Sequence, residues 1–146
     1  MPAEPRPSTP KHLWIIAILA LLWNAVGAFD YLMTQTRNQA YMSQFTQEQL
    51  DFFYGFPAWV DSAWAIAVWG AVFGSVLLLL RNRFAMHVFA VSLVAMVLTT
   101  IHNYVLNDGL AVMGGPGPVI FSALIFVVGV ALVLYARAMT RRGVLG

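Results

Sequence analysis

The hydrophobic residues of this chain fall into four long runs separated by polar segments. The runs cover about residues 13–34, 57–80, 84–106 and 116–136. Each is close to the ~20 residues that an α-helix needs to cross ~30 Å of hydrocarbon. The pattern predicts an all-α polytopic membrane protein, with residues 11–146 forming a bundle of four transmembrane helices as one domain.

The first ten residues differ in composition from the rest. They contain four prolines and little apolar surface, so we expect a disordered tail. Thr9 is expected to cap the first helix, with Pro10 in its first turn. The alternative is a signal peptide cleaved before Phe29, which would leave three spanning helices. The apolar run continues past Phe29 to spanning length, which favours an uncleaved helix.

The connection between the first two runs, residues 35–56, is polar and rich in aromatic side chains. Thr46 and Gln49 have the spacing of a capping box, in which each side chain bonds the other residue's backbone N–H. Gly55 and Pro57 end the segment that this box opens. We therefore expect a short amphipathic helix on the outer membrane surface between the first and second transmembrane helices.

The composition supports a membrane protein and excludes an ordinary soluble domain. Hydrophobic residues make up 60% of the chain and charged residues 10%, against averages of about 45–50% and about 25%. The formal charge of +2 comes from residues at the ends of the apolar runs, which does not indicate nucleic-acid binding. The absence of cysteine excludes disulfides and thiolate metal sites. We predict the lipid bilayer as the surroundings, and neither a cofactor nor a metal.

The basic residues indicate how the helices are oriented. One set of loops holds only Arg37, and the other holds seven basic residues: Arg6, Lys11, Arg81, Arg83, Arg137, Arg141 and Arg142. Loops rich in Lys and Arg face the cytoplasm. We therefore expect both termini in the cytoplasm and the 35–56 connection outside.

A few polar residues interrupt the apolar runs, where an ionisable group costs about 2.5–3.5 kcal/mol. The topology predicts five of them near the outer face: Asp30, Asp61, His102, Asn103 and, roughly 9 Å deeper, Asn24. If these side chains converge, they form a site for a cation, a proton relay or a polar solute. The alternative is that they bond only one another, or face water among the lipid headgroups.

Small residues line one face of the second predicted helix: Ala63, Ala67, Gly70 and Gly74. This small-residue stripe allows two helix backbones to approach closely. It lies opposite Asp61, so we expect it to contact a neighbouring helix or a second copy of the chain in a homodimer.

Four aromatic residues are predicted at the depth of the acidic groups: Tyr31, Trp59, Trp64 and Tyr104. Their rings are candidates for a surface that stacks on a sugar, a quinone or a cationic ligand. The alternative is an ordinary aromatic belt at the membrane interface. His12 and His87 are predicted near the cytoplasmic ends of the first and third helices. They raise a bis-histidine haem as an alternative, although neither has a supporting motif.

Two short patterns resemble a family of small four-helix bacterial inner-membrane proteins. The first is Trp23-Asn24-x-x-Gly27-x-x-Asp30-Tyr31, and the second is Tyr54-Gly55-Phe56-Pro57-x-Trp59. The similarity extends over most of the chain to Tyr135-Ala136-Arg137 and Arg141-Arg142-Gly143. Some members are labelled sugar transporters. The resemblance implies a location in the bacterial inner membrane and directs attention to the region of Asn24 and Asp30.

Three functional hypotheses follow. The first is a transport-type or proton- and cation-handling protein that uses the polar residues near the outer face. The second is a non-catalytic accessory subunit of a larger membrane protein complex. An enzyme is the third and least favoured, because the chain shows no nucleophile–base pair or metal motif.

Overall fold

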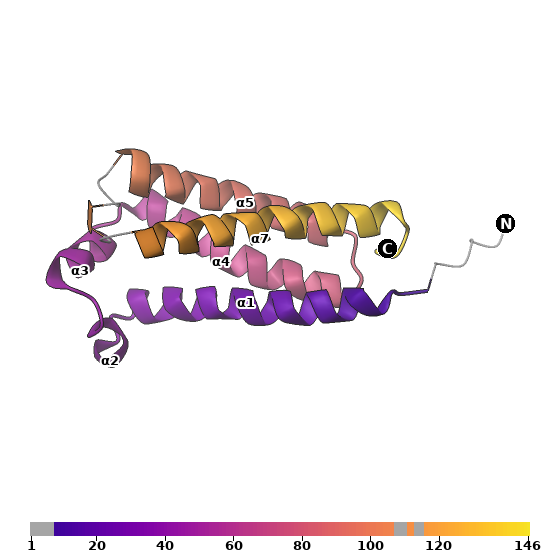
Figure 1. Ribbon diagram of the computed structural model, residues 1–146, viewed down its shortest axis with the longest axis horizontal. Helices are drawn as coiled ribbons and strands as arrows, with labels where there is room; N and C mark the ends of the chain where they lie inside the picture. Colours follow the sequence, from indigo (N-terminus) through magenta and orange to yellow (C-terminus); the bar gives the residue numbers. More distant parts are fainter. Residues whose placement is uncertain (1–7, 107–110, 113–115) are drawn as a thin grey trace.

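The computed structural model describes residues 8–106, 111–112 and 116–146, and the regular elements of these residues are all helices (Figure 1). The long ones are α1 (Lys11–Gln35), α4 (Ala58–Leu79), α5 (Ala85–Thr100) with its π-helical continuation η1 (Ile101–Leu106), and α7 (Pro116–Arg141). Four helices are long and apolar enough to cross a membrane. The predicted multi-pass four-helix bundle is thus confirmed. The predicted tail falls largely, and the 107–115 loop mostly, outside the described residues.

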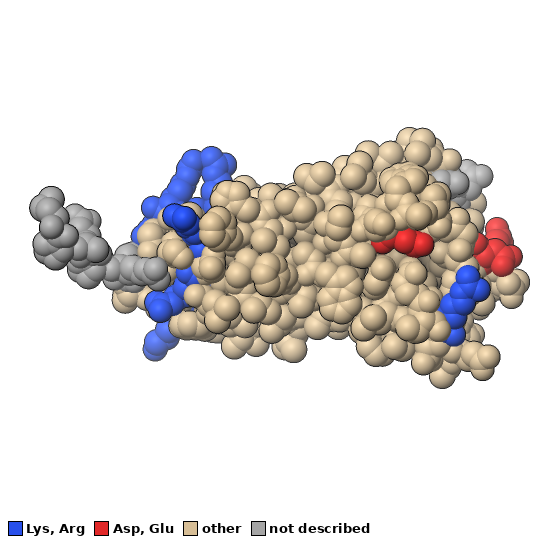
Figure 2. Space-filling view, turned by 180° about the vertical axis from the view of Figure 1, so that it is seen from behind, with Lys and Arg blue, Asp and Glu red and all other residues tan. Residues whose placement is uncertain are grey.

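The two ends of the bundle differ in their charged residues and in the short helices that they carry. One end, here called the basic end, carries Lys11, Arg81, Arg83, Arg137, Arg141 and Arg142. The opposite end, here called the loop end, carries the short helices α2 (Gln39–Met42) and α3 (Gln47–Tyr54). Figure 2 shows blue side chains gathered at the basic end and red ones towards the loop end. The capping box predicted for α3 is present, with both Thr46 and Gln49 bonding as expected.

Helix α4 packs between α1 and α5. Its small-residue stripe faces α5: a Cβ added at Gly70 would lie 3.2 Å from the Ser92 Cβ, and one at Gly74 would lie 2.7 Å from the Phe89 ring. The Ser92 hydroxyl also donates to the Ala67 carbonyl across this interface. The stripe is therefore covered by a helix of the same chain, which is the first of the two contacts expected for it. The homodimer stays a prediction.

The basic end is filled by a core of apolar side chains. Leu13 and Leu78 are fully buried there, together with Ala17, Ala85, Leu132, Ala136 and Met139. Val144 and Leu145, which follow the last turn of α7, are also buried in this core. The backbone N–H of Gly146 donates to the Arg81 carbonyl at 2.9 Å, which fastens the segment to the turn between α4 and α5.

Helices α1, α4 and α7 end in the same backbone arrangement. The residue after each cap has positive φ: Arg37 (53°), Arg81 (55°) and Gly143 (76°). The next residue then bonds back five positions, as Asn38 N–H does to Met33 (3.0 Å), Asn82 to Leu77 (2.8 Å) and Val144 to Met139 (3.0 Å). This is the Schellman motif, in which glycine is the usual residue at the positive φ. Two of the three positions therefore carry arginine at a conformational cost of about 1–2 kcal/mol each.

Two predicted helix ends are wrong. Pro10, not Thr9, is the N-cap of α1, and its extended backbone makes no side-chain cap. The Thr9 hydroxyl instead accepts a hydrogen bond from Arg81 Nη1 at 2.8 Å. A bond from a charged guanidinium is stronger than one from the neutral backbone N–H that a cap would accept. Helix α7 continues to Arg141 rather than stopping at residue 136. Hydropathy marks the apolar stretch, whereas Ala, Met and Arg favour helix beyond it.

Candidate functional site

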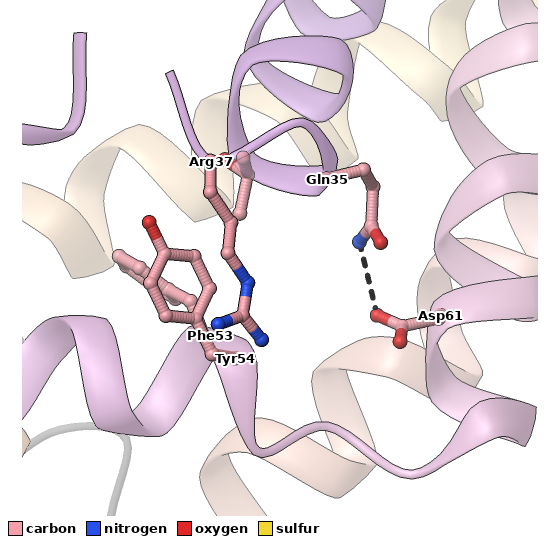
Figure 3. Close-up of a pocket in the computed structure, with 6 residues that line it drawn as sticks. Gln35, Arg37, Phe53, Tyr54 and Asp61 are labelled. Carbon is pink, nitrogen blue, oxygen red and sulfur yellow. Dashed lines mark hydrogen bonds between the residues drawn. The ribbon is translucent and has the colours of Figure 1, made fainter. Parts of the chain in front are cut away.

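A pocket of about 130 Å³ opens at the loop end, between the end of α1, the start of α4 and helix α3. Its lining residues are Thr34, Gln35, Arg37, Phe53, Tyr54 and Asp61. Figure 3 shows the Arg37 and Asp61 side chains on facing walls of this pocket. We call it the Arg37–Asp61 pocket. It is smaller than the ~300–1,000 Å³ typical of drug-sized ligand sites, so it suits a small polar group.

Arg37 reaches the pocket because of how α1 ends. The chain reverses direction at its positive φ of 53°, and the side chain leaves the helix towards α3. The guanidinium lies over the Tyr54 ring, 4.2 Å from the ring centroid. Such a cation–π contact holds the charge in place without occupying its N–H donors. No described residue accepts a hydrogen bond from this guanidinium.

Asp61 forms the opposite wall and lies in the first turn of α4. Its Oδ1 accepts a hydrogen bond from Gln35 Nε2 at 3.1 Å, which connects α4 to the last turn of α1. The other carboxylate oxygen has no partner among the described residues. An acidic residue in a helix's first turn also interacts favourably with the helix dipole.

The two charges of the pocket do not pair with each other. An ion pair requires N···O separations within 4.0 Å, and Arg37 and Asp61 do not meet that distance. Each is instead held by a neutral neighbour, Tyr54 or Gln35. A cation and an anion thus face each other across a small space that water can enter.

Asp30 is part of a different contact. Its carboxylate accepts a short hydrogen bond from the hydroxyl of Tyr41 in α2. Burial, then this hydrogen bond, then the charge of Asp30 raise the pKa of Tyr41 from its ordinary 10.0 to about 12. The bond fastens α2 to the side of α1, and the Phe29 ring packs edge-on against Tyr41 at 5.6 Å between centroids.

His102 and Asn103 lie in the π-helical turn that continues α5. His102 is 8% exposed, and the rings of Phe56 and Trp59 stand edge-on to it at 5.6 and 5.4 Å between centroids. Its Nδ1 bonds the Asn103 Oδ1 at 3.0 Å. A single π-helical turn within an α-helix is often found at functional sites. Here it brings a polar pair to the side of the α4 N-terminus.

The predicted polar residues do not form one cluster. Among the described residues, no three His, Asp or Glu side chains could hold one ion. Asn24, placed deeper in the sequence prediction, donates to Ser75 Oγ at 3.0 Å and to the Ala71 carbonyl at 3.3 Å. It therefore connects α1 to α4 inside the bundle. Of the five candidates, only Asp61 lines the pocket described above.

The four aromatic candidates contact side chains of neighbouring helices and do not line the pocket. Tyr31 and Phe56 both stand edge-on to Trp64, with centroids 5.0 and 6.0 Å away. Tyr104 bonds Ser122 of α7 at 2.9 Å through its hydroxyl. Trp59 contacts His102, as described above. These rings join the helices at the loop end, while the rings that line the pocket are Phe53 and Tyr54. His12, weighed as a haem ligand, bonds the Tyr135 hydroxyl at 2.6 Å, and His87 lies beside Phe84.

Comparison with known proteins gives no assignment. No family model, curated protein or solved structure matches the chain. The function therefore has to be argued from the site itself.

Sequence reasoning missed Arg37 as a site residue, although a signal was present. Arg37 is the sole basic residue on its side of the predicted topology, where the positive-inside rule disfavours one. It was used only to orient the helices. Tyr54, which contacts Arg37, and Gln35, which bonds Asp61, carried no signal, because their positions depend on how α3 and α4 pack against the end of α1.

Proposed function

We propose that this protein is a small transport-type membrane protein that admits a polar solute at its outer face, through the Arg37–Asp61 pocket. The observation that carries the proposal is the pair of opposite charges facing each other without forming an ion pair. An isolated charge pair tends to close when nothing separates it, because Coulomb attraction rises steeply at short distance. Two opposite charges that neutral neighbours hold apart can each bind a polar group of a solute.

This proposal modifies the prediction from sequence. The acidic residue Asp61 keeps its role, but its counterpart is Arg37 instead of Asp30 and His102. The orientation, with the loop end outside, rests on the positive-inside rule. The location in the bacterial inner membrane rests on the resemblance of the Trp23–Tyr31 pattern.

The absence of cysteine from the chain allows a direct test of the pocket. Phe53 lines the pocket and is partly exposed, whereas Ala63 of α4 is buried. In oriented proteoliposomes, a membrane-impermeant thiol reagent added outside should label Phe53→Cys. The comparison variant Ala63→Cys should stay unlabelled, because the reagent cannot reach a buried side chain. Equal labelling of the two variants, or none at Phe53→Cys, contradicts a water-filled pocket that opens outward.

Transport requires more than a pocket at one face. Below it, α1 and α4 are joined by the bond between Asn24 and Ser75, and Ser75 is fully buried. Passage of a solute between these helices must open this bond. We therefore expect Ser75→Cys to become reactive to the same reagent when solute is supplied, and to be inert without it. Continued inertness with every solute tested would reduce the proposal to binding without transport.

An accessory-subunit role is the second candidate, and helix α7 favours it. Only 11% of the apolar window of α7 is buried by the rest of the chain, against 28% for α4 and for α5. A helix covered so little by its own chain leaves more surface for another membrane protein. Purification in mild detergent should then yield a stoichiometric partner; a monomer without one contradicts this role.

A further inference from the structure

We propose that the ligand of the Arg37–Asp61 pocket is a small zwitterion, with an ammonium group at Asp61 and a carboxylate or phosphate at Arg37. The inference deepens the proposed function and rests on it for one point, that the pocket is open to water. It adds the chemical class of the solute.

The charges decide between classes of ligand. A simple cation drawn to Asp61 meets the guanidinium of Arg37 on the facing wall, and a simple anion drawn to Arg37 meets the carboxylate. Each is therefore opposed by one of the two walls. A molecule with both charges satisfies both walls, and its own dipole is aligned with the field across the pocket.

The available atoms fit such a ligand. The guanidinium of Arg37 lies over the Tyr54 ring and no described residue accepts a hydrogen bond from it, so it can bond an oxyanion with two parallel hydrogen bonds. Asp61 gives one oxygen to Gln35 and keeps the other as an acceptor for an N–H of the ligand. A primary ammonium supplies that donor, and a quaternary one does not.

The pocket volume of about 130 Å³ limits the ligand to the size of an amino acid or of the headgroup of an amine-bearing phospholipid. Both carry the same pair of charges, so the experiment has to separate a free solute from a lipid.

The test uses the Phe53→Cys variant as a reporter and three solutes of similar size. β-Alanine carries both charges, propionate only the negative one, and propylamine only the positive one. In phosphatidylcholine bilayers, β-alanine should slow thiol labelling about tenfold when the pocket is about nine-tenths occupied. Propionate and propylamine should have little effect at the same concentration. A parallel set of bilayers that contain phosphatidylethanolamine, without added solute, tests the lipid as the source.

Removing one of the two charges should change which of the three solutes the pocket binds best. With Asp61→Asn added to the reporter, propionate should protect and β-alanine should lose its advantage. With Arg37→Gln, propylamine should protect instead. A gain of protection cannot come from misfolding, so these variants remain informative even if they are less stable.

The outcomes separate the two proposals. Protection by β-alanine alone identifies a free zwitterion, and slowing by phosphatidylethanolamine alone identifies a lipid headgroup. If Phe53→Cys is labelled but neither source protects it, or if propionate or propylamine protects the otherwise unchanged pocket equally well, the zwitterion proposal is overturned while the outward pocket stands. If Phe53→Cys is not labelled at all, both proposals fail.

Discussion

The two ends of the bundle share a helix-ending motif but differ in what surrounds it. At the basic end α4 ends in a Schellman motif with Arg81 at the positive φ, and at the loop end α1 ends in the same motif with Arg37 at that position. Arg81 donates to the Thr9 hydroxyl, and the buried Val144 and Leu145 fill the space between the helices. Arg37 bonds only the face of a ring, and the space beside it stays open.

This difference separates structure from function along the molecule. An end packed with buried apolar side chains holds the helices together. An open end with two unpaired charges contributes less to packing and is suited to binding. Binding sites commonly sacrifice local stability in this way. Substitutions at the two ends should therefore differ in kind, with stability lost at one and ligand recognition lost at the other.

The largest effect on stability is expected from Leu78→Ala at the basic end. Leu78 is fully buried, and its truncation leaves a cavity. The loss should be about 2–3 kcal/mol, in the lower half of the range for soluble cores, because the unfolded side chain remains in hydrocarbon. Equilibrium unfolding in mixed micelles measures it, with Leu80→Ala, 70% exposed, as the matched control. Gln35→Ala beside the pocket should cost less than about 1 kcal/mol, since Gln35 is exposed and water replaces its hydrogen bond to Asp61. Equal losses at Leu78 and Gln35 would contradict the contrast between the ends.

The next effect concerns how tightly the helices approach along their length. In Gly74→Ala the added methyl would lie 2.7 Å from Phe89, which belongs to the buried core, so one of the two helices must move. We expect a loss of about 1–2 kcal/mol after the gain in helix propensity. Nearer the loop end, a methyl at Gly27 would be 3.8 Å from Val68, an ordinary contact. Gly27→Ala should be neutral or stabilising in the same unfolding assay, and a loss as large as that of Gly74→Ala would show that both halves are packed alike.

Hydropathy and charge predicted the architecture because both act locally along the chain. The four spans, the capping box of Thr46 and Gln49 and the small-residue stripe were all visible in the sequence. The partner of the stripe was not, because composition does not say which helix packs there. The site was predicted only at Asp61. Depth along a helix is readable from sequence, whereas rotation about its axis and the path of the α2–α3 connection determine which polar groups meet.

A smaller effect on stability is expected from the hydrogen bond between the Tyr41 hydroxyl and the Asp30 carboxylate. Tyr41→Phe removes a hydrogen bond to a carboxylate and should cost about 1 kcal/mol, because the contact is partly exposed. The raised pKa of Tyr41, about 12 against 10.0, means that this contribution is complete below pH 10 and is lost as the pH rises through 12. Titration of tyrosinate absorbance should show a late-ionising fraction that is smaller by one tyrosine in Tyr41→Phe. If the two proteins titrate identically, Asp30 and Tyr41 are not bonded in solution.

The substitution Arg37→Gly should change stability least and should remove recognition of the zwitterion. In Arg37→Gly the relief of backbone strain, about 1–2 kcal/mol, is offset by the greater freedom of the unfolded glycine and by the lost contact with Tyr54, about 0.5–1 kcal/mol each. The unfolding free energy should therefore stay within about 1 kcal/mol of the original. Arg81→Gly makes the same backbone change at the basic end, but it loses the hydrogen bond to the Thr9 hydroxyl and should be somewhat less stable than Arg37→Gly. The two variants should differ in the thiol-protection assay, where Arg37→Gly loses protection by the zwitterion and Arg81→Gly retains it. Because the backbone change is the same, a loss in both variants would assign the effect to the helix ends in general, and a loss in neither would remove Arg37 from the site.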